Sequence, residues 1–319
     1  MKNMRISVFF FYVLLVVSTL AACSTSKETE NNNSMQTKEK TSQTRIYKDY
    51  IGHKVEIPVS PERVVYHGEN YGDLLPLHIE PVGALYSWIT DYVFEDQVKN
   101  VEDVGFPINT EKVLELNPDL IIIATPDEKV YEELSKIAPT VVLDTFAPID
   151  ARLMELGDIL GKKQEATDWL ANYANKEEKM WKQLVDEEVL KPGETASVFT
   201  YYPGNRLFIM ASTGLSQVLY HPNGFRPGEK IQPILDEGVG FEEISLELLS
   251  EYAGDRIFIL TPESEEAIQS TNDMIDSAIW KSLPAVKNGK VYTLEIEKSS
   301  SDATTREWLL DELPSMLKK

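Results

Sequence analysis

The chain has 319 residues and a formal net charge of −21, with 31 Lys and Arg against 52 Asp and Glu. So large an acidic excess argues against nucleic-acid binding, because phosphate backbones are held by cations. A single cysteine excludes a disulfide framework, and the length is sufficient for a large hydrophobic core that needs no such support.

Residues 1–22 have the pattern of a bacterial lipoprotein signal. Lys2 and Arg5 precede an apolar run at residues 6–17, which is shorter than the roughly 20 residues of a membrane-spanning helix. The run is followed by Leu-Ala-Ala-Cys, a sequence similar to a lipobox that ends at Cys23. This similarity implies cleavage before Cys23 and a diacylglycerol on its sulfur, while an ordinary signal peptide with an incidental cysteine is the alternative.

Residues 23–44 are predicted to be a lipidated cysteine and a flexible tether. From residue 24 onward the segment holds one apolar residue, Met35, and no aromatic residue, so it buries too little surface to fold. Such a tether would hold the folded body about 25 Å from the membrane. Removal of residues 1–22 would take away two cations and no acid, changing the charge from −21 to −23. The protein is expected at the extracellular face of the cell membrane.

Residues 45–150 are predicted to form the first of two lobes. A hairpin at residues 47–58 comes first, and strands then alternate with helices along the chain. The expected strands are at residues 61–66, 81–85, 119–124 and 140–143, and the expected helices at 74–79, 110–116 and 128–138. Alternating strands and helices predict a mostly parallel sheet.

Residues 151–190 are predicted to be a helical connector between the lobes. Apolar residues recur at helical spacing on both sides of Gly161, which fits a helix C-terminus. After this glycine no strand pattern interrupts residues 163–190. A helix of about 25 residues is close to 40 Å long, which is enough to reach from one lobe to the other.

Residues 191–319 are predicted to form the second lobe. Extended runs at residues 195–202 and 207–210 flank a turn and predict a hairpin. The remaining expected elements are helices at residues 214–220, 275–281 and 304–317 and a strand at 290–292.

One pattern occurs once in each lobe. Residues 111–126 align without a gap on residues 247–262, 136 positions later, with seven identities that include Glu111/Glu247 and Asp119/Asp255. Each copy reads as a short helix, a turn and a buried strand. A unit that recurs once at this spacing indicates two similarly built lobes rather than a solenoid, and the cleft between two lobes is a natural ligand site.

The lipobox, the hairpin, the two repeat units, the long helix and the segment 280–292 together resemble the iron-siderophore and cobalamin binding lipoproteins of ABC importers in Gram-positive bacteria. The resemblance covers residues 45–319. It implies an α/β fold of two three-layer α/β/α lobes joined by one long backbone helix, like class III periplasmic binding proteins. It also implies a monomer that is not an enzyme and has no cofactor.

The resemblance gives the repeated glutamates a role. In the family one exposed glutamate per lobe docks on arginines of the two permease subunits, which in turn carry an ATPase, and the matching positions are Glu111 and Glu247. Favourable placement near a helix N-terminus is the alternative explanation for each glutamate alone. Two equivalent glutamates on two lobes favour docking, because two similar subunits require two similar contacts.

The ligand cleft is expected at the carboxyl ends of the strands. The candidate ligand-binding residues are His67, Trp88, Tyr201, Tyr202, Arg206, Arg226 and Arg306. Aromatic rings with a few arginines suit an anionic iron chelate that is bulky, partly apolar and rich in carboxylate or hydroxamate oxygens. For the tyrosines the alternative is packing of a strand on a helix, and for Arg206 and Arg226 it is a solvated surface position.

The resemblance also bears on the type of chelate. Relatives that bind triscatecholates carry two arginines where this chain has Thr200 and Tyr202. A ferric hydroxamate or citrate-hydroxamate siderophore is therefore favoured, with ferric citrate, haem, cobalamin and a sensory module without transport as alternatives.

Direct metal binding and catalysis are not expected. The four histidines include His53 in a predicted hairpin turn and His78 in a predicted helix, so they are not expected to converge on a metal, and iron would be held by its chelator alone. Nucleophile-elbow, zinc-protease and phosphate-loop motifs are missing from the sequence.

Overall fold

The computed structural model describes residues 43–318. The predicted signal, Cys23 and almost all of the predicted tether lie outside the described residues. The described residues form one compact unit. No helix in the described part of the chain is long and apolar enough to cross a membrane.

The first lobe is built on a five-stranded parallel sheet, preceded by the predicted antiparallel hairpin of β1 (Thr44–Lys48) and β2 (Lys54–Pro58). The strand order is β5-β4-β3-β6-β7. The strands are β3 (Val64–His67), β4 (Gly83–Ala84), β5 (Glu102–Asp103), β6 (Leu120–Ile123) and β7 (Thr140–Val142). This order confirms the predicted parallel sheet.

Both faces of this sheet are covered, because successive strand residues point to opposite sides. On one side Val65 and Ile121 pack with residues of α1 (Thr110–Glu115) and α2 (Glu128–Leu134). On the other side Tyr66 and Ile122 pack with α3 (Ile149–Ile159) and the hairpin. Short 3₁₀ helices η1 (Tyr71–Asp73), η2 (Tyr86–Trp88) and η3 (Glu95–Gln97) occupy the loops.

The second lobe has a mixed six-stranded sheet of order β11-β9-β8-β12-β13, with β10 also paired to β8. Its strands are β8 (Thr195–Tyr202), β9 (Arg206–Met210), β10 (Arg226–Pro227), β11 (Phe241–Ile244), β12 (Arg256–Thr261) and β13 (Val291–Glu295). The pairs β8·β9 and β9·β11 are antiparallel and the others are parallel, so the predicted hairpin of β8 and β9 is confirmed.

Helices cover both faces of the second sheet as well. Val198 and Phe258 face a layer that contains α5 (Leu215–Leu219) and α11 (Ala303–Leu317). Phe199 and Ile259 face the opposite layer, which contains the remaining helices of the lobe. These are α6 (Gln232–Asp236), α7 (Leu249–Tyr252) after η4 (Leu246–Leu248), α8 (Glu265–Asp276), α9 (Ala278–Ser282) and α10 (Pro284–Lys287). Two three-layer α/β lobes confirm the predicted fold class.

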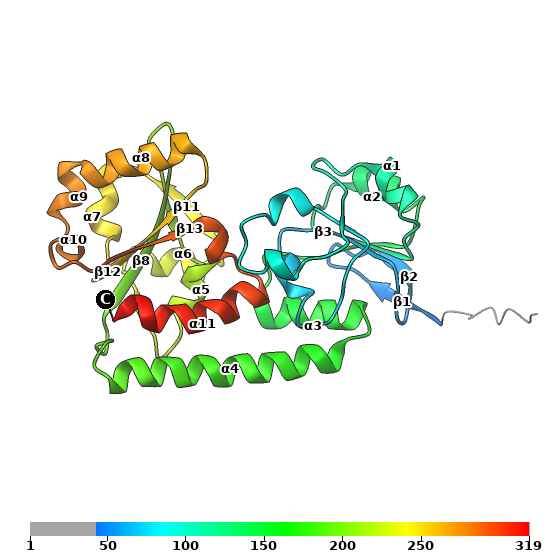
Figure 1. Ribbon diagram of the computed structural model, residues 1–319, viewed down its shortest axis with the longest axis horizontal. Helices are drawn as coiled ribbons and strands as arrows, with labels where there is room; N and C mark the ends of the chain where they lie inside the picture. The colour runs from blue at the N-terminus through cyan, green and yellow to red at the C-terminus, as the bar shows by residue number, and fades with distance from the viewer. Residues whose placement is uncertain (1–42, 319) are drawn as a thin grey trace, which may run out of the picture. The chain divides into compact units, whose positions relative to one another are not determined.

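The long connector is α4 (Lys163–Asp186), 24 residues or about 36 Å in length. Ala166 near its start belongs to the core of the first lobe, whereas Met180 and Trp181 belong to the core of the second. Figure 1 shows α4 passing beneath both sheets, next to α11. The chain turns between α3 and α4 at Gly161, where φ is +69° and a Cβ atom would lie 2.6 Å from the carbonyl oxygen of Val59.

The repeated aspartates attach each helix–strand unit to the neighbouring strand. The carboxylate of Asp119 accepts hydrogen bonds from the N–H groups of Glu62 and Arg63, at 2.7 and 2.9 Å, just before β3. The carboxylate of Asp255 accepts from the N–H and hydroxyl of Thr195 at the start of β8, both at 2.9 Å. The repeat therefore performs the same structural task in both lobes.

Two predicted elements differ from the structure. The helix predicted at residues 74–79 is absent: residues 74–78 form turns and His78 has a φ of 56°, although Leu74 and Leu77 are buried as helical spacing predicted. Pro76 lacks the N–H that a helix would use there. The prediction also placed a helix only at residues 275–281, whereas α8 begins at Glu265 and is separated from α9 by Ser277.

Candidate functional site

A cavity of about 400 Å³ lies between the two lobes and is called the interlobe cavity below. From the first lobe its lining includes Glu69, after β3, and Trp88 in η2. From the second lobe it includes Tyr202 at the end of β8 and Glu297 in η5 (Ile296–Ser299). The other lining residues are Asn70, Tyr92, Met210, Thr213, Gly214, Leu260, Ile296, Ser299, Ser300 and Ser301.

A second hollow of about 390 Å³, the side pocket, shares Tyr202, Met210 and Ile296 with the interlobe cavity. Its other lining residues are Thr200, Arg206, Phe208 and Phe241. The ring of Phe208 stands edge-on to Tyr202 and Phe241, with centroids 5.8 and 5.9 Å apart. The guanidinium of Arg206 lies 4.9 Å from the Phe208 ring centroid and 3.1 Å from the carboxylate of Glu243.

The segment that supplies the serines of the interlobe cavity is held by the first lobe. The hydroxyl of Ser301 donates to Oδ1 of Asn70 at 3.3 Å, and the amide nitrogen of Asn70 donates to the carbonyl oxygen of Thr145 at 2.8 Å. The buried guanidinium of Arg152 contacts both Asp73, at 2.6 Å, and the carbonyl oxygen of Ser301, at 2.7 Å. These bonds fix one wall of the cavity across the lobe boundary.

The start of α11 continues this attachment. The N–H of Ala303 donates to Oδ1 of Asp73 at 2.7 Å, and the hydroxyl of Thr304 donates to the carbonyl oxygen of Gly72 at 2.7 Å. The carboxylate of Asp302, which is buried, caps the helix by accepting from the N–H of Thr305 at 2.8 Å. A helix that belongs to the second lobe thus begins on the first.

The carboxyl groups at the interlobe cavity have few positive charges or hydrogen-bond donors near them. Burial, and then the carboxylates of Glu263, Glu295 and Asp91, raise the pKa of Glu297 to about 7. Its Oε2 is buried without a hydrogen-bond partner among the described residues. Desolvation by the cavity walls also raises the pKa of Glu69. Among the described residues that line the interlobe cavity there is no Lys, Arg or His.

Four of the predicted ligand-binding residues lie at or beside these hollows. Trp88 and Tyr202 line the interlobe cavity, and Arg206 lines the side pocket. The indole of Trp88, which is 42% exposed, packs on Phe106 with ring centroids 4.6 Å apart. His67 is buried behind this pair, stacked on Phe106, and its Nε2 lies 3.1 Å from the carbonyl oxygen of Gly105.

Tyr201 and Arg306, also predicted to bind ligand, lie in the packed interior. Tyr201 points to the other face of β8 from Tyr202, into the core, and its hydroxyl donates to Oδ1 of Asn205 at 2.8 Å. Arg306 is 6% exposed and joins α11 to α4 and α5 through Tyr173 and Gln217, at 3.3 and 3.0 Å.

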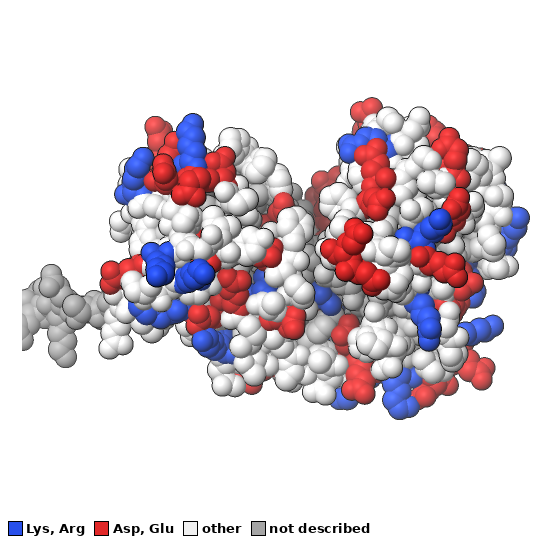
Figure 2. Space-filling model, turned by 180° about the vertical axis from the view of Figure 1, so that it is seen from behind, with Lys and Arg blue, Asp and Glu red and all other residues white. Residues whose placement is uncertain are grey.

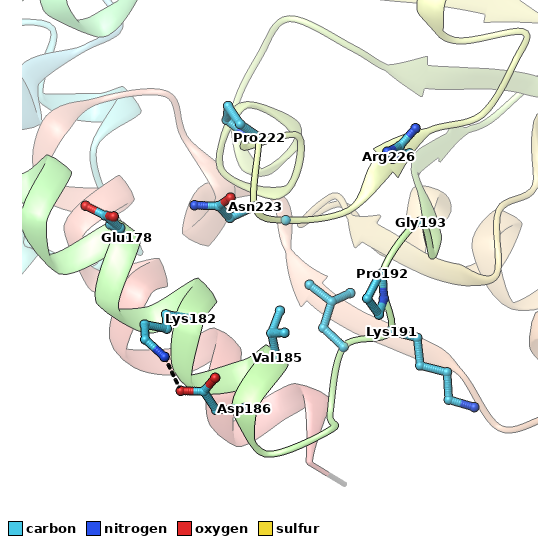
Figure 3. Close-up of a pocket in the computed structure, with 12 residues that line it drawn as sticks. Glu178, Lys182, Val185, Asp186, Lys191, Pro192, Gly193, Pro222, Asn223 and Arg226 are labelled. Carbon is cyan, nitrogen blue, oxygen red and sulfur yellow. Dashed lines mark hydrogen bonds and ion pairs between the residues drawn. The ribbon is translucent and has the colours of Figure 1, made fainter.

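Arg226 lies at the opposite end of β8 from the interlobe cavity. It pairs with Thr195 at the start of that strand, whereas Tyr202 is at the end. Its side chain lines a separate pocket together with Glu178 and Lys182 of α4 (Figure 3). The structure therefore separates Arg226 from the other candidates.

Sequence reasoning missed Glu297, Ile296, Tyr92 and Met210 as cavity residues. For Glu297 a signal existed, since it follows a strand end, where parallel sheets place their sites. This signal is weak in a chain with 52 Asp and Glu residues, because most carboxylates of so acidic a protein are expected at the solvated surface. Figure 2 shows that carboxylates also border the hollow between the lobes.

No group of three or more His, Cys, Asp or Glu residues is placed to hold a metal ion within residues 43–318. His53, for example, contacts Asp49 and Glu128 and is not among the residues that line the interlobe cavity. The two predicted docking residues, Glu111 in the first turn of α1 and Glu247 in η4, are both exposed.

Comparison with known families matches residues 64–297 to the periplasmic binding protein family. The chain is 33% identical over 267 residues to the iron(3+)-hydroxamate-binding protein YxeB of Bacillus subtilis, covering 81% of this chain and 80% of the relative. It is 28% identical over 303 residues to the probable siderophore-binding lipoprotein YfiY of the same organism, covering 90% and 91%.

Among solved structures, SirA of Staphylococcus aureus in complex with staphyloferrin B superposes with a TM-score of 0.73 at 27% identity. The match covers 86% of this chain and 99% of SirA. The similarity therefore includes both lobes and the helix between them.

Proposed function

Because this chain belongs to the periplasmic binding protein family, we propose that it captures a ferric siderophore, of the hydroxamate or citrate-hydroxamate type, and delivers it to an ABC importer. The family consists of binding proteins, so the function is capture rather than catalysis. The relatives named for iron-hydroxamate and siderophore binding support this type of ligand.

The observation that carries the proposal is the interlobe cavity. Trp88 of the first lobe and Tyr202 of the second offer aromatic surface to the same space, and the side pocket adds Phe208 and Phe241. Bulky, partly apolar chelates suit such walls. A triscatecholate complex carries three negative charges and would meet Glu69 and Glu297 with no cation among the described lining residues, so it is disfavoured.

We place the protein at the outer face of the membrane, held by a lipid on Cys23 through a tether at residues 23–44. The lipobox-like sequence and the relative named as a lipoprotein support this anchor. The exposed positions of Glu111 and Glu247, at equivalent places in two similarly built lobes, support docking on two permease subunits with their ATPase.

A titration of residues 42–319 with ferric and iron-free hydroxamates tests the proposal. Binding of the ferric chelate should quench tryptophan fluorescence in a saturable manner, because Trp88 lines the cavity and is partly exposed. The Trp88→Phe variant should lose most of this quenching while calorimetry still detects binding. Tight zinc binding without a response to any ferric chelate would overturn the proposal.

A further inference from the structure

The charge of the cavity lining defines the ligand more narrowly than the family does. Three hydroxamates balance one ferric ion, so the net charge of a ferric trihydroxamate is set by its pendant groups. The lining contributes the carboxyl groups of Glu69 from the first lobe and Glu297 from the second, and no cation among the described residues. Among the described residues that line the side pocket Arg206 is the one cation, and Glu243 pairs with it at 3.1 Å.

Two further carboxyl groups face each other across the lobe boundary near Glu297. Asp91 follows η2 of the first lobe, and Glu263 follows β12 of the second. Burial and the charge of Asp91, to which it is also hydrogen bonded, raise the pKa of Glu263. Like charges on opposite lobes repel, so a positive group bound between them would be attracted by both lobes at once.

The environment of Glu297 shows that a positive partner is missing from the described residues around it. Its Oε2 is buried and accepts no hydrogen bond there, although a buried carboxylate oxygen normally has a partner. Its raised pKa reflects the same deficit, because burial and three neighbouring carboxylates outweigh the hydrogen bond it accepts from its own N–H. A ligand ammonium group in the interlobe cavity would supply the missing positive charge.

The aromatic wall is compatible with such a ligand. Trp88 and Tyr202 line the same cavity as the carboxyl groups, and a cation is attracted to the face of an aromatic ring. We infer that the interlobe cavity prefers ferric hydroxamates with a net positive charge, carried by a protonated amine, and that Glu297 together with Glu69 sets this preference. The inference rests on the proposed function, since it specifies the chelate that the same cavity takes.

Three chelates that differ in one group test it: ferric desferrioxamine B, with a free protonated amine, and its N-acetyl and N-succinyl derivatives, which are neutral and negative. Calorimetry with residues 42–319 at pH 8 should show the highest affinity for the positive chelate, a lower affinity for the neutral one and the lowest for the negative one. Each step should change the dissociation constant about tenfold. Higher salt should narrow the differences.

Glu297→Gln should reduce the advantage of the positive chelate over the neutral one to about threefold or less, with the affinity for the neutral chelate changed by no more than about twofold. Retained affinity for the neutral chelate also shows that the variant is folded. Glu178→Gln is the matched control, because Glu178 is exposed on α4 and lines the separate pocket of Figure 3. This control should leave the ranking unchanged.

The possible results separate the inference from the proposed function. Equal affinity of the parent protein for all three chelates, or a preference for the negative one, would overturn the charge preference and leave hydroxamate capture standing. An unchanged ranking in Glu297→Gln would overturn the role of Glu297. Binding of none of the three chelates, with the protein folded, would overturn the proposed function itself.

Discussion

At the scale of single residues, Glu297 connects ligand preference to stability. The titratable and charged groups near it are Asp91 and Tyr92 of the first lobe and Tyr202, Glu263, Glu295 and Lys298 of the second. The one ammonium group in this set, that of Lys298, pairs with Glu295 at 2.5 Å. Glu297 is therefore surrounded by more negative than positive charge in the ligand-free protein.

We expect Glu297→Gln to stabilise the ligand-free protein at pH 8 and to leave it nearly unchanged at pH 4.5. The folded-state pKa of about 7 exceeds the ordinary 4.5, so between these values the folded protein binds more protons and the parent loses stability as pH rises. Because Glu297 is only partly buried, solvent screens part of this repulsion, and the difference at pH 8 should be about 1–2 kcal/mol.

Urea unfolding at the two pH values measures this difference. Glu178→Gln, which removes a charge from an exposed position, serves as the control and should show no such dependence on pH. The same stability difference at pH 4.5 and pH 8 would show that Glu297 does not titrate in this range.

At the scale of elements, the sequence predicts those strands and helices whose apolar residues follow a regular local pattern. Strands of continuous apolar residues, such as β6, and helices with an apolar stripe, such as α4, lie where periodicity placed them. The start of α8 was missed because its buried face consists of only Ala267, Thr271 and Met274, among polar residues. Its N-cap, Ser264, was the available signal, since its hydroxyl accepts from the N–H of Ala267.

The sequence predicts which segments border the cleft, but not which of their side chains point into it. Carboxyl ends of strands converge in a parallel sheet, so Trp88 and Tyr202 were both expected near one cleft, and both line the interlobe cavity. The periodicity of β8 does not say which face of the sheet meets which helices, so Tyr201 and Tyr202 could not be told apart. Arg306 bonds to Tyr173 and Gln217, which are far away in sequence, and no local pattern contains those contacts.

The junction between η1 and α11 gives a prediction at this scale. A Cβ atom on Gly72 would lie 1.9 Å from Oδ1 of Asp302 and 2.8 Å from the ring of Phe94. Gly72→Ala must therefore displace the residue that caps α11. Overpacking and loss of the cap together should lower the free energy of unfolding by about 2–4 kcal/mol.

The displacement should also weaken chelate binding, because Ser301 in the cavity wall immediately precedes Asp302. Gly228→Ala is the matched control, since the nearest atom to its Cβ would be at an ordinary 3.7 Å. Denaturant unfolding and chelate titration of both variants measure the two effects. If Gly72→Ala is as stable as Gly228→Ala, the close packing between η1 and α11 does not contribute to the stability of the folded protein.

At the scale of the whole described body, two helices are shared between the lobes. The apolar face of α4 begins in the core of the first lobe and ends in that of the second, while α11 begins on η1 and packs along α4. Such continuous packing restrains relative motion more than a flexible strand crossover would. The docking surface presented to a permease should therefore keep a nearly fixed spacing between the lobes.

That expectation concerns Glu111 and Glu247 directly. Both side chains are exposed, each in the equivalent repeat unit of its lobe, and each unit is attached by its own aspartate to the adjacent strand. Replacing both glutamates by alanine removes no buried contact, so stability and affinity for the ferric chelate should be unchanged. Charge pairs at the rim of an interface orient and speed docking, so uptake of the iron chelate by cells should fall at least about tenfold.

Radiolabelled iron uptake in cells that carry the variant, compared with chelate titration of the purified protein, separates docking from capture. The matched control is Glu132→Ala with Glu266→Ala, which also removes one exposed helical glutamate from each lobe. Uptake should remain normal in this control, because a general loss of negative charge is not what docking requires. If both double variants take up iron at the parental rate, the repeated glutamates are not the docking contacts. A similar defect in both would instead point to nonspecific electrostatic attraction between an acidic protein and its receptor.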